Sequence, residues 1–132
     1  MSITRNVRKE VEIMEIVVST LSSVQRKVKK VKKQLDDKMP DALYDTLRLH
    51  VIRLKHTIDD LKLEIRSDLP DRSSRIRFLR MQAGLSLKFA LHQLYVLVPR
   101  LSGCDPDLQL RYARLIAESE RVPNTIPQPI AS

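Results

Sequence analysis

Apolar residues recur at intervals of three and four along most of this chain, the spacing that places side chains on one face of an α-helix. The first such stripe consists of Val7, Val11, Met14, Val18, Leu21, Val24, Val28, Val31 and Leu35. Three residues replace four between Leu21 and Val24, which indicates a local shift in the phase of the stripe. The pattern predicts one long helix over about residues 4–38.

Prolines divide the rest of the chain into three further helical stretches. The breaks are marked by Pro40, by Pro70 and by the segment from Pro99 to Pro106, and Pro123 follows the last stretch. Because proline cannot continue a helix without losing a hydrogen bond, we predict helices over about 41–68, 73–98 and 106–121. The three prolines in the last eleven residues predict an extended, mobile tail over 123–132.

The second and fourth stretches each carry one apolar stripe and a start signal. The second stripe comprises Leu43, Leu47, Val51, Leu54, Ile58, Leu61 and Ile65. The fourth helix is introduced by Asp105, Pro106 and Asp107. This order supplies a capping carboxylate, a proline in the first turn and an acid near the positive end of the helix dipole.

The third helix is apolar on two opposite sides. One line comprises Ile76, Leu79, Ala83, Leu87, Ala90, Leu94 and Leu97, and the other comprises Phe78, Met81, Leu85, Phe89 and Val96, with His92 near it. The lines lie about 200° apart by the helical period, whereas a bundle helix normally keeps one face for water. We therefore expect the second apolar line to be packed against something else, either a second subunit or the long first helix folded over it. We prefer a second subunit, with its interface at Phe78, Met81, Leu85, Phe89, His92 and Val96.

Composition agrees with a single helical domain. The chain has 132 residues, of which 42% are hydrophobic and 30% charged, which is typical of a folded soluble protein. Two glycines are too few for Gly-rich phosphate loops, and 4% aromatic residues with no tryptophan argue against an all-β sandwich or barrel. We predict an all-α protein, an up-down antiparallel four-helix bundle over 1–122.

The sequence also predicts a cytoplasmic protein with no membrane anchor. The most apolar run, from Ala83 to Val98, has 16 residues and includes Lys88, His92 and Gln93, whereas a membrane span needs about 20 mostly uncharged residues. The N-terminal residues lack the apolar region of a secretory signal. The single cysteine, Cys104, cannot form a disulfide within the chain.

Positive charge is concentrated in two windows that contain no acid. Lysine and arginine number 24 against 16 acids, a net charge of +8. Residues 16–35 hold six cations and residues 72–104 hold six more. Local surplus of this kind predicts an anionic partner. We assign nucleic-acid binding to Arg26, Lys27, Lys29, Lys30, Lys32, Lys33, Arg72, Arg75, Arg77 and Arg80.

Each window has a plainer interpretation. Cations in the second half of the first helix are stabilised by its dipole and can form a solvated face. In the second window, Asp68 and Asp71 can neutralise the arginines as surface ion pairs. Against this, arginines at a helix start lie where the dipole disfavours cations, so a bound phosphate would relieve them. We regard the second window as the sharper signal, and either structured RNA or duplex as a suitable ligand.

Residues for catalysis or metal binding are not indicated. His50, His56 and His92 lack the spacing of a helical metal site, and the pairs Asp36–Asp37 and Asp59–Asp60 point about 100° apart on a helix. No histidine near Cys104 would activate the thiol. The aromatics Tyr44, Phe78, Phe89, Tyr95 and Tyr112 fall on or beside apolar stripes and are interpreted as packing residues. We therefore expect no enzyme, no cofactor and no metal.

Two short segments resemble a known family. They are Ala83-Gly84-Leu85-Ser86-Leu87-Lys88-Phe89, preceded by basic residues, and Leu115-Ile116-Ala117-Glu118, followed by Arg121. With the order and lengths of the helices, they are similar to the accessory variability determinant proteins of diversity-generating retroelements, four-helix bundles related to proteins encoded in ribosomal-RNA intervening sequences. The resemblance implies a homopentamer that binds template RNA or an RNA–DNA hybrid, associates with a reverse transcriptase in mutagenic retrohoming, and has no catalytic activity of its own.

Two other functions remain open. The chain could be a helical interaction module whose basic windows dock an acidic protein surface. A peripheral membrane protein using the polybasic helix is the third reading, although no aromatic-anchored amphipathic face supports it.

Overall fold

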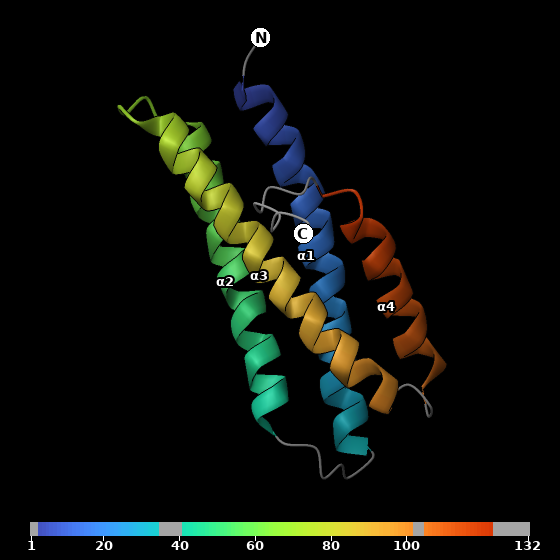
Figure 1. The fold of residues 1–132 in the computed structure, drawn as a ribbon. Coiled ribbons are helices and arrows are strands. Elements are labelled where there is room, and N and C mark those ends of the chain that lie inside the picture. Colours follow the sequence, from blue (N-terminus) through green and yellow to red (C-terminus); the bar gives the residue numbers. More distant parts are fainter. Residues whose placement is uncertain (1–2, 35–40, 102–104, 123–132) are drawn as a thin grey trace, which may run out of the picture.

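Four helices account for nearly all of the described chain. The computed structural model describes residues 3–34, 41–101 and 105–122, and the predicted tail and Cys104 lie outside them. The helices are α1 (Ile3–Gln34), α2 (Asp41–Ile65), α3 (Arg72–Leu101) and α4 (Pro106–Ser119). They pack as a bundle with antiparallel contacts, which confirms the predicted all-α bundle class (Figure 1).

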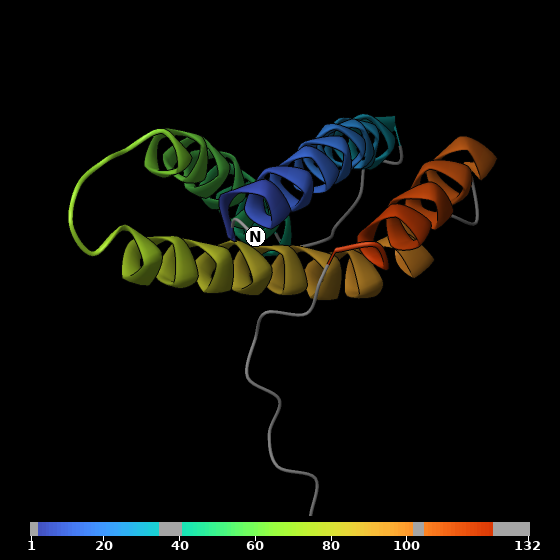
Figure 2. The same ribbon diagram turned by 90° about the horizontal axis from the view of Figure 1, so that it is seen from above.

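The packing order places α1 and α2 at the centre of the arrangement. The most extensive contact joins α2 to α3, and α1 packs between α2 and α4, whereas α3 makes smaller contacts with α1 and α4. Seen from above, α1, α2 and α4 all lie on the same side of α3 (Figure 2). The opposite side of α3 therefore has no cover from the other three helices.

The core is built from the predicted stripes, with one shift of register in α1. Val17 is buried and Val18 only partly so, although the stripe was drawn through Val18. The buried positions then run from Val17 through Leu21 and Val24 at alternating intervals of four and three. The irregular interval is therefore between Met14 and Val17, and the predicted phase shift at Leu21 was placed too far along the chain.

The α3 helix extends beyond its predicted end. It continues through Pro99 to Leu101, whereas Pro99 was expected to mark a break. Proline lacks only its own N–H, so in the last turn it removes a single helical hydrogen bond. Leu101 is fully buried, and this burial holds the final residues in place. At the other end, Asp71 precedes the helix with φ of 63°, a left-handed conformation that aspartate tolerates better than most residues.

The start of α4 follows its sequence signal. The Asp105 carboxylate accepts a hydrogen bond from the Leu108 backbone N–H at 3.1 Å, and Pro106 occupies the first turn. Leu108 and Leu115 are buried against the bundle. Helix α2 ends at Ile65, not at the predicted residue 68, and the N–H groups of Arg66 and Ser67 bond to carbonyls only three residues back.

Candidate nucleic-acid interface

The cations of α1 divide into two groups by direction. Arg26, Lys29, Lys30 and Lys33 are exposed and lie within roughly 100° of one another around the helix, and we call them the basic strip. Within the described part of the chain none of the four forms an ion pair. Like charges this close repel one another, so a bound anion would lower the energy of the strip.

Lys27 lies on the flank of α1 that faces α4, about 100° round the helix from Arg26, and is already neutralised. Its Nζ lies 3.0 Å from Asp105 Oδ2 and 3.4 Å from Asp107 Oδ2, at the start of α4. The hydrogen bond to Asp105 raises the pKa of Lys27, and the same bond lowers the pKa of Asp105. Lys27 therefore fastens α1 to α4. Lys32 is half-buried and engaged in an interaction of its own.

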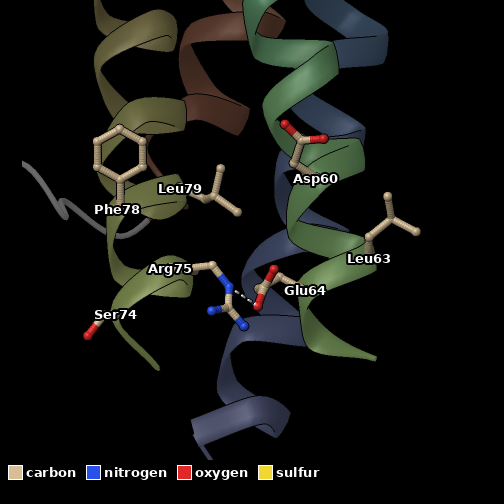
Figure 3. Close-up of a pocket in the computed structure, with 7 residues that line it drawn as sticks. All are labelled: Asp60, Leu63, Glu64, Ser74, Arg75, Phe78 and Leu79. Atoms are coloured by element: carbon tan, nitrogen blue, oxygen red, sulfur yellow. Dashed lines mark hydrogen bonds and ion pairs between the residues drawn. The ribbon is translucent and has the colours of Figure 1, made fainter. Parts of the chain in front are cut away.

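The arginines at the start of α3 mostly point back into the bundle. Arg80 donates from Nε and Nη2 to the two carboxylate oxygens of Glu10 on α1, each at 2.6 Å. Arg75 donates from Nε to Glu64 of α2 at 2.5 Å (Figure 3). It also donates from Nη1 to the Pro70 carbonyl at 2.6 Å. Ion pairing thus accounts for these two arginines, as in the alternative interpretation of this window, but the partners are Glu64 for Arg75 and Glu10 for Arg80, not Asp68 and Asp71.

The other two arginines of this window differ from each other. Arg77 is exposed and has no ion pair within the described residues, whereas Arg72 is half-buried and engaged. The ten predicted binding residues therefore do not form one surface. The structure gathers the basic strip on α1 and leaves Arg77 apart on α3, so the first window provides the more open cationic surface.

The second apolar line of α3 is largely exposed and runs along the edge of that helix next to α2, where Phe78 lines a pocket with Leu63 (Figure 3). Phe78 is 58% exposed and Phe89 49% exposed, while Met81 and Val96 are partly buried and Leu85 and His92 are exposed. Tyr95, which the predicted interface omitted, is 71% exposed, lies about 100° round the helix from Phe78, and is near enough to Tyr112 of α4 to raise the pKa of that phenol. The described residues of α1 do not cover this surface, which rules out that alternative for them.

The aromatic side chains correct one interpretation. Tyr44 and Tyr112 pack partly against the core, as packing residues should. Phe78, Phe89 and Tyr95 instead remain exposed, because their positions lie roughly 120 to 140° round the helix from the core line of α3. The His50 ring of α2 stacks on Phe89 with centroids 5.3 Å apart. Burial, and next the charge of Arg53, lower the pKa of His50.

Further features bear on the function classes. No cluster of three or more His, Cys, Asp or Glu side chains that could hold a metal ion occurs in the described ranges. Across the same ranges, every helix falls short of the length and apolarity that crossing a membrane requires.

Comparison of the chain with protein-family models, with curated proteins and with solved structures gave no match.

Proposed function

We propose that this protein is a non-catalytic nucleic-acid-binding accessory protein that self-associates through α3. The observation that carries the proposal is the basic strip, four exposed cations on the last turns of α1 in a window without acids. Clustered cations of this kind suit the sugar–phosphate backbone, where binding releases counterions and depends little on base sequence. The resemblance of residues 83–89 and 115–118 supports a reverse transcriptase and its template RNA as the working partners, in mutagenic retrohoming.

Salt dependence tests the nucleic-acid part. We expect a fluorescently labelled single-stranded RNA to bind with an affinity that falls steeply between about 50 and about 200 mM salt. Replacing all four strip cations with glutamine should reduce the slope of log K against log salt by about 3, since each phosphate contact contributes roughly 0.7 for single strands. A duplex measured in parallel reports the preference between the two forms.

The matched control changes the same number of charges elsewhere. It replaces four exposed cations outside the strip, namely Arg8, Lys9, Arg48 and Arg121, with glutamine. The control should keep most of the salt slope. Equal losses in the two variants would show that only net charge matters, and salt-insensitive binding by the wild type would contradict the proposal.

Self-association rests on the uncovered apolar side of α3. An exposed row of large apolar side chains along a helix is a common mark of a protein interface. Because α3 carries cations but no acid, two copies paired symmetrically through α3 would bring only like charges together. A contact between α3 and a different face of the neighbour avoids this repulsion, and such head-to-tail contacts generate a ring when the rotation between neighbours closes. The pentamer implied by the family resemblance is an assembly of this type.

Light scattering at several protein concentrations tests the assembly. Phe78→Asp and Tyr95→Asp place a charge on side chains that are more than half exposed, so the fold should survive while the assembly dissociates. Leu110→Asp on α4, also 71% exposed, is the control and should leave the mass unchanged. A wild type that stays monomeric at every concentration would exclude self-association.

The same surface favours one second candidate. The exposed aromatics are flanked by Arg77 and Lys88, which suits an acidic amphipathic partner protein. A stoichiometric complex that survives nuclease treatment and is lost in Phe78→Asp would favour this candidate. Loss of the complex on nuclease treatment would favour nucleic acid.

A further inference from the structure

A groove of about 440 Å³ runs between α1 and α2, beside the first cation of the basic strip. Its lining comprises Glu15, Val18, Ser19, Ser22 and Arg26 from α1, and Lys55, Ile58, Asp59 and Lys62 from α2. The antiparallel packing brings Ser22 and Arg26 opposite the part of α2 that carries Lys55. Sequence reasoning missed Lys55 because its own helix contains acids and no cationic run.

Ser22 is an unsatisfied polar group in this groove. The residue is only 8% exposed, and its hydroxyl has no hydrogen-bond partner in the described part of the chain. A buried hydroxyl without a partner destabilises the folded state, and alanine at this position would be a better helix former. An unsatisfied buried hydroxyl is expected at a position where a ligand supplies the missing hydrogen bond.

The charges of the groove leave one cation in excess. Lys62 pairs with Glu15, with Nζ 3.1 Å from Oε1. Arg26 and Lys55 are exposed and form no ion pair within the described residues, while Asp59 contributes one negative charge. Three cations against two carboxylates give the lining a net charge of +1.

We propose that this groove holds one phosphodiester of a bound RNA strand, with Arg26 and Lys55 at the phosphate oxygens and the Ser22 hydroxyl donating a hydrogen bond. A staggered rotation about the Ser22 Cα–Cβ bond is the movement that turns the hydroxyl into the groove. The single excess charge suits a monoanionic diester better than a dianionic monoester. This assignment rests on the proposed nucleic-acid binding. It places one end of the bound RNA segment at the groove.

The groove adjoins the basic strip along α1, since Arg26 belongs to both. From Ser22 to Lys33 the helix rises by about 16 Å, at roughly 1.5 Å per residue. A strand seated at Ser22 can therefore pass Lys29 or Lys30 and reach Lys33 with successive phosphates. The groove supplies a defined seat at one end, and the exposed lysines supply further contacts.

The decisive variant is Ser22→Ala, measured for RNA affinity and for thermal stability. We expect binding of the labelled single-stranded RNA to weaken about tenfold, because a hydrogen bond to a charged acceptor is lost. The melting temperature should rise, because an unsatisfied hydroxyl is removed. A loss of stability would instead show that the hydroxyl has a structural partner, and would overturn the assignment.

The matched control is the buried hydroxyl of Thr57 on α2, which donates to the Arg53 carbonyl at 2.8 Å. Thr57→Val should leave RNA affinity unchanged, since its hydroxyl is already satisfied inside the helix. Arg26→Gln and Lys55→Gln should each lower the salt slope by about 0.7, and Lys9→Gln should not.

The outcomes separate this inference from the function on which it rests. If the four-cation strip variant loses salt slope while Ser22→Ala and Lys55→Gln bind like Lys9→Gln, the groove does not bind a phosphate and the basic strip remains a binding surface. If the wild type does not bind RNA at all, the proposed function itself fails. If inorganic phosphate competes as well as the diester dimethyl phosphate at equal ionic strength, the preference for a diester is wrong.

Discussion

The ion pair between Glu10 and Arg80 offers a test of whether the arginines of α3 serve the fold or a ligand. The two side chains are 12% and 25% exposed and share two parallel hydrogen bonds of 2.6 Å between α1 and α3. An exposed pair contributes at most about 1 kcal/mol, whereas breaking a buried one costs about 3 to 5 kcal/mol. This partly buried pair lies between these limits.

We expect Glu10→Gln and Arg80→Gln each to lower the free energy of unfolding by about 2 kcal/mol, because each leaves a partly buried charge without its partner. The double variant should lose clearly less than the sum, with a coupling energy of about 1 kcal/mol. Urea denaturation monitored by circular dichroism, at one fixed protein concentration, gives all four values.

RNA binding provides the second measurement on the same proteins. Under conditions where it is folded, Arg80→Gln should bind RNA as tightly as the wild type, in contrast to Arg26→Gln. If Arg80→Gln weakens RNA binding while stability and coupling stay unchanged, the reasoning is refuted, because Arg80 then contacts the ligand and not Glu10.

Three further predictions follow from the core, from a histidine and from a helix cap. Leu94→Ala, at a fully buried position of α3, should lower the free energy of unfolding by about 3 kcal/mol in denaturant titrations, and a loss below about 1 kcal/mol would contradict the packing. Burial and the charge of Arg53 lower the pKa of His50, so the unfolded state binds the proton more readily than the folded state. The free energy of unfolding should therefore decrease as the pH is lowered from about 7.5 to about 5.5. His50→Gln should reduce this dependence, and an unchanged profile would contradict it. The pKa of Asp105 is lowered by Lys27, so its contribution is present above the ordinary carboxyl pKa and is lost as pH falls through the folded value. The melting temperature of Asp105→Asn should therefore decrease less than that of the wild type as the pH is lowered through the carboxyl range.

The number, order and type of the helices could be predicted because local signals agree with the packing. The stripe of α2 from Leu47 to Ile65 is buried as drawn, and the cap at Asp105 forms the predicted bond. The exceptions are positions where two adjacent residues are equally apolar. Val17 and Val18 cannot be distinguished by hydrophobicity, and only the direction of the neighbouring helices decides which one is buried.

The charged surface was harder to predict because ion-pair partners come from distant segments. Glu10 precedes Arg80 by 70 residues, and Asp105 follows Lys27 by 78. A window of sequence without acids therefore says nothing about acids that the fold brings to it. The strip cations are exposed and pair with no described acid on their side of α1, whereas nothing in the sequence singles out Ser22 or Lys55.

The distribution of charge on α3 follows from its place at the margin of the bundle. All of its cations must find anions outside the helix, since residues 72–101 contain no acid. Arg75 and Arg80 lie at the seams with α2 and α1 and pair with Glu64 and Glu10. Arg77 lies away from these seams and pairs with nothing among the described residues.

A neighbouring subunit that covers the exposed aromatics of α3 must therefore present acidic side chains at the edge of the contact. Arg77→Glu should then weaken self-association in light scattering, and a variant that assembles more tightly would show that the neighbour's surface there is basic.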